Sequence, residues 1–80
     1  MPLYFFHLRD GVDILLDPEG RQIDKPDAIP EVALREARSI IGDDAARGRI
    51  LLDQHIDVED EARNVLHTLH FVDAVEIVYP

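Results

Sequence analysis

The chain has 80 residues, of which 46% are apolar and 31% charged, with no cysteine and a formal net charge of −9. This balance predicts one small globular domain, and it excludes disulfides, thiolate metal sites and cysteine nucleophiles. The negative field disfavours nucleic acid and anionic membranes as direct partners. No apolar run reaches the length of a membrane span and no signal peptide is recognisable, so we expect a cytoplasmic protein.

The opening residues predict a β-strand. Side chains alternate along residues 3–9, and every second one is apolar. We therefore expect one side of this strand to lie in the core. The expected core residues are Tyr4, Phe6 and Leu8, and the opposite side carries Leu3, Phe5, His7 and Arg9.

Two turns follow this strand. The Asp-Gly pair at 10–11 predicts a hairpin, because glycine tolerates positive φ. We expect the returning strand to place Ile14 and Leu16 on the core side. The Asp-Pro-Glu-Gly segment at 17–20 predicts a second turn, in which proline presets φ and glycine takes the strained position. Residues 21–23 then return briefly as a strand.

The apolar period becomes helical from Ala28, and we expect Asp27 to cap this helix. The sequence is compatible with two different C-terminal ends of this helix. The helix stops at Gly42, or it continues to Arg47 before Gly48. The apolar stripe of the helix consists of Val32, Ala33, Ala37, Ile40 and Ile41.

The last third of the chain predicts a second pair of strands. Ile56 and Val58 alternate with acidic residues, which is typical of a half-buried strand. A polar turn at 59–63 precedes a strand over 64–71, and we expect this strand to resume at 75–79. The order is therefore ββ-α-ββ. It predicts an α+β fold in which about four antiparallel strands carry one helix on one face.

Candidate catalytic and metal-binding residues are few. His67 and His70 point to opposite sides of a strand, which does not suit a shared metal ion. Ser39, the sole serine, lies mid-helix without the sharp turn that exposes a nucleophile. We therefore predict no catalytic residue, no metal site and no cofactor, and a protein that is not an enzyme. The weak polar candidates are His7, Arg9 and His67, and we expect Arg9 to form an ion pair with Asp10, Asp13 or Asp17.

A single helix covers one side of a sheet, so apolar residues on the other side need another partner. We predict an exposed apolar patch there that mediates self-association or partner binding. Alternatively, residues 50–52 or the C-terminal segment fold over it. The possible interface residues are Leu3, Phe5, Leu15 and Leu66.

Four stretches of the sequence resemble a family of short bacterial proteins, common in alphaproteobacteria, that is known as a domain of unknown function. They are YFFHLRDG, DPEG, PDAIPEVALREA and VLHTLHFVDAVEI. Relatives often have glycine where this chain has Ala62 or Arg63, and proline near His70, which affects the expected turn geometry. The resemblance implies a bacterial cytoplasmic protein and carries over no activity and no site.

The sequence therefore predicts a non-catalytic interaction or regulatory module, most simply a homodimer. One alternative is an acidic, antitoxin-like neutraliser of a basic partner, suggested by the layout of a hairpin followed by a helix. Another is a small metal- or ligand-binding protein that uses its histidines.

Overall fold

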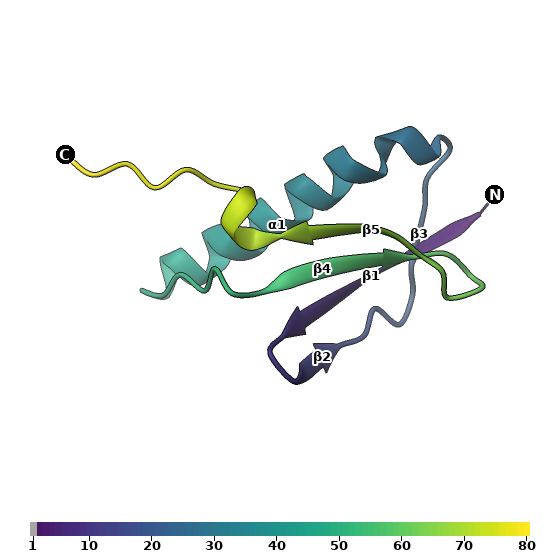
Figure 1. Cartoon of the computed structure of the whole chain (residues 1–80), viewed down its shortest axis with the longest axis horizontal. Helices are drawn as coiled ribbons and strands as arrows, with labels where there is room; N and C mark the ends of the chain where they lie inside the picture. The colour runs from purple at the N-terminus through teal and green to yellow at the C-terminus, as the bar shows by residue number, and fades with distance from the viewer. Residues whose placement is uncertain (1) are drawn as a thin grey trace.

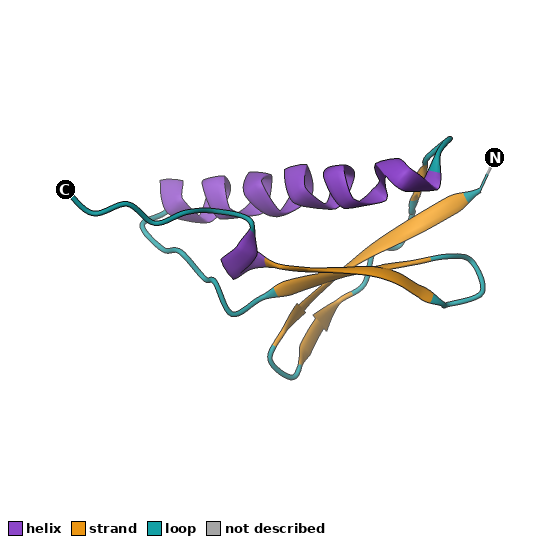
Figure 2. Ribbon diagram, turned by 45° about the horizontal axis from the view of Figure 1, so that its top comes forward, coloured by secondary structure: helices purple, strands orange, loops and turns teal. Residues whose placement is uncertain are grey.

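The structure is a computed structural model that describes residues 2–80, and it has two layers. One antiparallel sheet has the order β2-β1-β4-β5, and β3 also pairs with β1. Helix α1 lies across one side of this sheet, and we call the other side the outer face (Figure 2). The predicted α+β class and the order of strands around one helix are confirmed. The elements are β1 (Leu3–Asp10), β2 (Asp13–Leu15), β3 (Arg21–Gln22), the 3₁₀ turn η1 (Pro26–Ala28), α1 (Ile29–Ala46), β4 (His55–Glu59), β5 (Val65–His70) and the 3₁₀ turn η2 (Phe71–Asp73).

The core lies between α1 and the sheet. Side chains alternate on β1 and β4 as predicted, and the helix side of both strands is apolar. Phe71, at the start of η2, is fully buried and closes the end of the core. The core residues are Tyr4, Phe6, Ile23, Ile29, Ala33, Ala37, Ile41, Ile56, Val58, Phe71 and Ala74, with Leu8 packed at their margin.

The orientation predicted for β2 is wrong. Leu8 pairs directly with Leu15 across the two-residue turn of the hairpin. Directly paired residues share a side of the sheet, so Leu15 lies on the helix side and Ile14, opposite Arg9, on the outer face. The hairpin extends away from α1 (Figure 2), which leaves Ile14, Leu15 and Leu16 49%, 69% and 64% exposed.

Helix α1 runs through Gly42 to Ala46, so the longer of the two predicted helices is correct. Asp27 does not cap it. Pro26 begins the turn η1, Asp27 lies inside that turn, and the N-cap position of α1 falls on Ala28, which makes no side-chain cap hydrogen bond.

The strand expected at 75–79 is absent from the described structure. β5 ends at His70, and η2 turns the chain toward α1, where the Arg38 Nε donates a hydrogen bond of 2.8 Å to the Ala74 carbonyl. The residues beyond leave the sheet as an extended tail (Figure 1). Within residues 2–80, no helix is both long and apolar enough to cross a membrane.

Candidate functional site

The outer face carries a cluster of charged and polar side chains beside the predicted interface residues Leu3 and Phe5. These side chains come from β1, β4 and β5, which lie side by side (Figure 1). Neighbouring partners meet because His7 is paired with Asp57, Arg9 with His55, and Asp57 with Thr68. We call this cluster the outer network: His7, Arg9, His55, Asp57, Glu59 and Thr68.

Asp57 is the centre of the outer network. Only 8% of this residue is exposed, and its carboxylate accepts hydrogen bonds from Arg9 Nε at 2.5 Å and Thr68 Oγ1 at 2.7 Å. His55 Nε2 lies 3.7 Å from the same carboxylate. Desolvation raises the pKa of Asp57, but the hydrogen bonds from Thr68 and Arg9, together with the nearby His55 and Arg9 charges, hold it below its usual value of 3.8. The carboxylate is therefore a paired, ionised anchor of the sheet.

The second half of the outer network is centred on His7. Its Nδ1 accepts the Asp17 backbone N–H at 3.0 Å, so the neutral ring carries its proton on Nε2. That nitrogen faces Glu59 Oε1 at 3.7 Å, and Arg9 Nη2 lies 3.9 Å from the other oxygen of Glu59. The rings of Phe5 and His7 stack with their centroids 6.3 Å apart. Each titratable group here thus already has a partner within the chain.

The turn after β2 covers the middle of β1. Asp17 Oδ2 accepts the Phe6 N–H at 3.1 Å, and Oδ1 accepts the N–H groups of Glu19 and Gly20 at 3.2 and 3.0 Å. Gly20 has a φ of +70°, and a β-carbon there would lie 2.9 Å from the Phe5 ring. Glycine is therefore required by both the backbone conformation and the close approach of Phe5.

Two grooves flank this turn. One, of about 630 Å³, lies on the outer face and is lined by Phe5, His7, Arg9, Leu16, Asp17, Pro18, Glu59, Asp60, Glu61 and Arg63. The other, of about 390 Å³, lies between the hairpin and α1 and is lined by Phe6, Leu8, Leu15, Leu16, Asp17, Pro18, Arg21, Glu36, Ile40 and Ile56.

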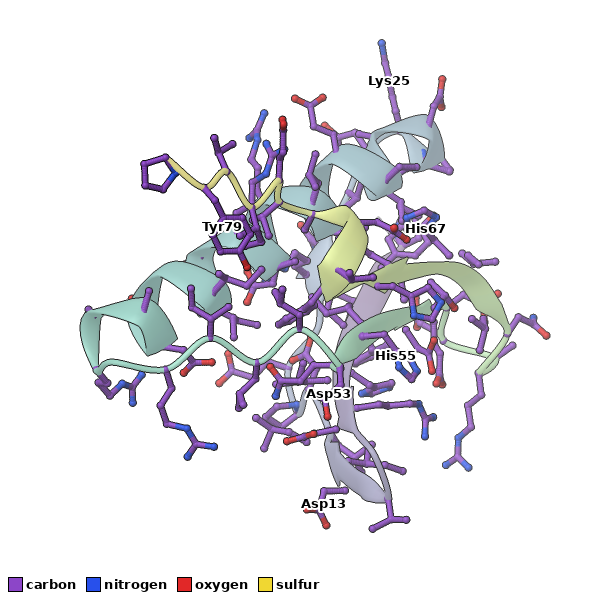
Figure 3. The ribbon with its side chains drawn as sticks, turned by 60° about the vertical axis from the view of Figure 1, so that its left-hand side comes forward. Asp13, Lys25, Asp53, His55, His67 and Tyr79 are labelled. Atoms are coloured by element: carbon purple, nitrogen blue, oxygen red, sulfur yellow. The ribbon has the colours of Figure 1, made fainter. Side chains whose placement is uncertain are left out.

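The structure brings together two of the three weak polar candidates. His7 and Arg9 share Glu59 as a neighbour, whereas His67 pairs with Val58 and lies on the helix side. Figure 3 shows His67 and His55 on opposite sides of the sheet. The expected ion pair of Arg9 with Asp10, Asp13 or Asp17 is wrong, because the Arg9 side chain, paired across the strands with His55, reaches along β4 to Asp57 and Glu59.

The possible interface residues do not form one patch. Leu3 and Phe5 lie on the outer side of β1 and are half-buried, with Phe5 against Gly20. Leu15 lies on the helix side, and Leu66 is 48% exposed at the irregular start of β5. The alternative, that residues 50–52 fold over this face, is wrong, since Leu52 packs on the core and the turn at 17–20 lies beside Phe5.

The four histidines do not gather at one site. His55 and His70 face each other on the outer face with ring centroids 5.3 Å apart, as expected if His67 and His70 point to opposite sides. In the described part of the chain, no three or more His, Cys, Asp or Glu side chains are placed to hold a metal ion.

The edge formed by β5 is the other feature of note. β5 is the last strand in the sheet order, and across residues 2–80 no strand pairs with its far side. Its six residues include no Asp, Glu, Lys, Arg or Pro. Val65 and Leu66 are 54% and 48% exposed. Natural edge strands are normally protected by charges, prolines or short length, so this edge is suited to pairing with another strand.

Comparison with known proteins finds one family. Residues 3–72 match a family described as a domain of unknown function, DUF6894. Searches of curated proteins and of solved structures gave no match.

Proposed function

The chain belongs to the DUF6894 family, a domain of unknown function, and on that premise we propose that it is a non-catalytic interaction module that self-associates. The observation that carries this proposal is the unprotected edge of β5. The opposite end of the sheet differs, because β2 has only three residues and begins with Asp13. A short, charged edge strand resists pairing with another chain, whereas β5 does not.

The outer network supports a structural role over a catalytic one. Asp57 already binds Arg9 and Thr68, and His7 already binds the Asp17 backbone. A general base or nucleophile needs a lone pair that is available to a substrate. The neutral His7 ring uses its one lone pair in this bond, and Arg9 and Thr68 hold the Asp57 carboxylate in place, which favours a binding module whose sheet these contacts keep rigid.

Sedimentation equilibrium tests the proposal. We expect a dimer at tens of micromolar (on the order of the weak end of specific association). Because the two chains carry −9 each, dimerisation should strengthen modestly as salt screens their repulsion. A monomer at every concentration up to about 100 μM, above this weak end of specific association, contradicts the proposal.

Hydrogen exchange provides a second, residue-level measurement. The backbone amides of Thr68 and His70 should become protected as concentration rises, while the exposed amide of Val12 at the hairpin tip should exchange at the same rate throughout. Concentration-dependent protection located elsewhere moves the interface away from β5.

A further inference from the structure

We infer that β5 pairs antiparallel with β5 of a second copy, about a two-fold axis that passes beside Thr68. This inference rests on the proposed self-association and adds the partner strand and its register. The resulting assembly has one continuous sheet across both copies.

The first step is the direction of the backbone groups. The Phe71 N–H donates to the Gln54 carbonyl at 3.0 Å, which makes this pair a hydrogen-bonded pair of the antiparallel ladder. Such pairs alternate with non-hydrogen-bonded ones. Thr68, opposite Asp57, and His70, opposite His55, therefore direct their N–H and C=O groups away from β4.

Side-chain geometry agrees with this assignment. Residues in non-hydrogen-bonded pairs have their α-carbons and side chains closer together. The short hydrogen bond between Thr68 and Asp57 and the His55–His70 ring contact both occur at such pairs. The edge of β5 thus offers outward donors and acceptors at Thr68 and at His70.

The second step is the register. A hydrogen-bonded pair in a new ladder requires outward-facing residues on both strands. Setting Thr68 opposite Thr68 of the second copy meets this condition and overlaps residues 66–70 of both strands. It places His70 opposite Leu66, and His67 opposite Leu69 on the helix side. A centre at Leu69 reduces the overlap to residues 68–70. A centre at His67 keeps five overlapping residues, but it pairs fewer of the alternate residues 66, 68 and 70 with one another, so Thr68 is the favoured centre.

The third step is charge. A second copy of a chain with net charge −9 is repelled by most of its surface. β1, β2, α1 and β4 each contain at least one carboxylate, and β3 contains Arg21. β5 contains neither acidic nor basic side chains apart from its histidines. Two copies therefore meet with the least repulsion along β5.

The ends of the paired strands add apolar contact. Val65 is 54% exposed at the start of β5, and Val72 is 58% exposed just beyond its end. The Thr68 register brings Val65 of each copy beside the turn that holds Val72 of the other. Helix α1 packs over β4 and β5, so the two-fold axis places the two helices on the same side of the continuous sheet. Exposed apolar surface at this edge is thus covered by the second copy.

Cysteine cross-linking tests the register cleanly, because the chain has no cysteine of its own. At the two-fold axis, the α-carbons of a hydrogen-bonded pair lie about 5.5 Å apart, within disulfide range. In the Thr68→Cys variant, mild oxidation should convert most of the protein to covalent dimer. The matched variant Leu66→Cys should stay uncross-linked, because four residues of strand separate its two α-carbons by about 14 Å.

A backbone variant tests the same edge without a new bond. His70 has a φ of −83°, which proline can adopt, and its N–H points away from β4. His70→Pro should keep the far-ultraviolet circular dichroism of the wild type while weakening dimerisation at least about tenfold, the effect of losing hydrogen bonds across the edge. His70→Ala, which keeps the N–H, should dimerise as the wild type does.

The outcomes separate this inference from the proposed function. A wild-type dimer in which Leu66→Cys cross-links, or neither variant does, overturns the Thr68 register and leaves self-association standing. A wild type that is monomeric overturns both. A dimer that is unaffected by His70→Pro overturns pairing through β5 altogether.

Discussion

Replacing Asp17 by alanine should destabilise the fold more than its position in a surface turn suggests. The substitution removes the acceptor of the Phe6 N–H, a partly buried donor in the middle of β1. An unsatisfied buried donor costs about 1–3 kcal/mol. The N–H groups of Glu19 and Gly20 also lose their acceptor, but they can bind water, which adds about 0.5 kcal/mol each. The free energy of unfolding should fall by roughly 2–4 kcal/mol in total.

Urea denaturation followed by circular dichroism measures this loss. Desolvation raises the pKa of Asp17, but hydrogen bonds from Gly20, Phe6 and Glu19 and the charge of Arg21 lower it below 3.8. A folded-state pKa below the unfolded value stabilises the protein above the unfolded pKa, and this contribution is lost as pH falls through the folded pKa. The difference between wild type and Asp17→Ala should therefore be full at pH 7 and shrink below about pH 4, the ordinary aspartate range.

Two further variants serve as controls for the same measurement. Asp17→Asn keeps one carbonyl acceptor and should lose about half as much stability. Its free energy of unfolding should also depend less on pH in acid than that of the wild type. Glu19→Ala, in the same turn, should change stability by less than about 0.5 kcal/mol. An Asp17→Ala protein as stable as the wild type, or a difference that is undiminished at pH 2, would falsify the assignment of this carboxylate as the acceptor that holds the turn against β1.

Three more predictions follow from the packing and the charge. Phe6→Ala should cost about 3–5 kcal/mol in urea melts, because Phe6 is 8% exposed, and Phe5→Ala should cost less; the reverse order would exchange the two sides of β1. Gly20→Ala should lower the thermal midpoint by an amount equivalent to about 1–3 kcal/mol, since its φ is +70° and the added β-carbon would meet the Phe5 ring at 2.9 Å; an unchanged midpoint means that this turn relaxes freely. The chain should give no mobility shift with double-stranded DNA at physiological salt, and a salt-sensitive shift contradicts the argument from its −9 charge.

The sequence predicts the elements of this fold better than it predicts their mutual register. The change from a period of two to a helical period correctly places α1 and β4, because burial against one core decides both. The sides of β2 depend instead on the length of the hairpin loop. A two-residue loop sets Leu15 opposite Leu8, and a register shift of one residue exchanges every side chain between the two sides.

The candidate site was predicted only in part. The sequence predicts His7 and Arg9 as polar residues on the outer side of β1, but it does not predict their partners Asp57 and Thr68 as part of a site. The alternation of side chains along β4 places Asp57 on the side of the sheet away from the core residues Ile56 and Val58. This alternation is the sequence signal that points to Asp57. Its partners come from strands up to 48 positions away, a pairing that no local pattern encodes. The β-branched segment at 75–79 shows the converse, since strand propensity without a partner strand gave no strand.

The turn at 17–20, which lies over the middle of β1, also limits how many copies of the chain the sheet could join in the proposed assembly. On the outward side of β1, Leu8 is paired with β2 and Tyr4 with β3, and the Asp17 carboxylate occupies the gap between them at Phe6. Within residues 2–80, this side of β1 therefore has no run of unpaired backbone left for a foreign strand, and the edge strand beyond it, β2, has only three residues and begins with Asp13. A domain in which two strand edges are free to pair would assemble into a fibre. A domain that pairs only through β5, with β5 of a second copy, forms a dimer and stops there. If the chain pairs through β5 as proposed, the Asp-Pro-Glu-Gly turn at 17–20 and the short strand β2 would together keep the opposite end of the sheet from adding further copies.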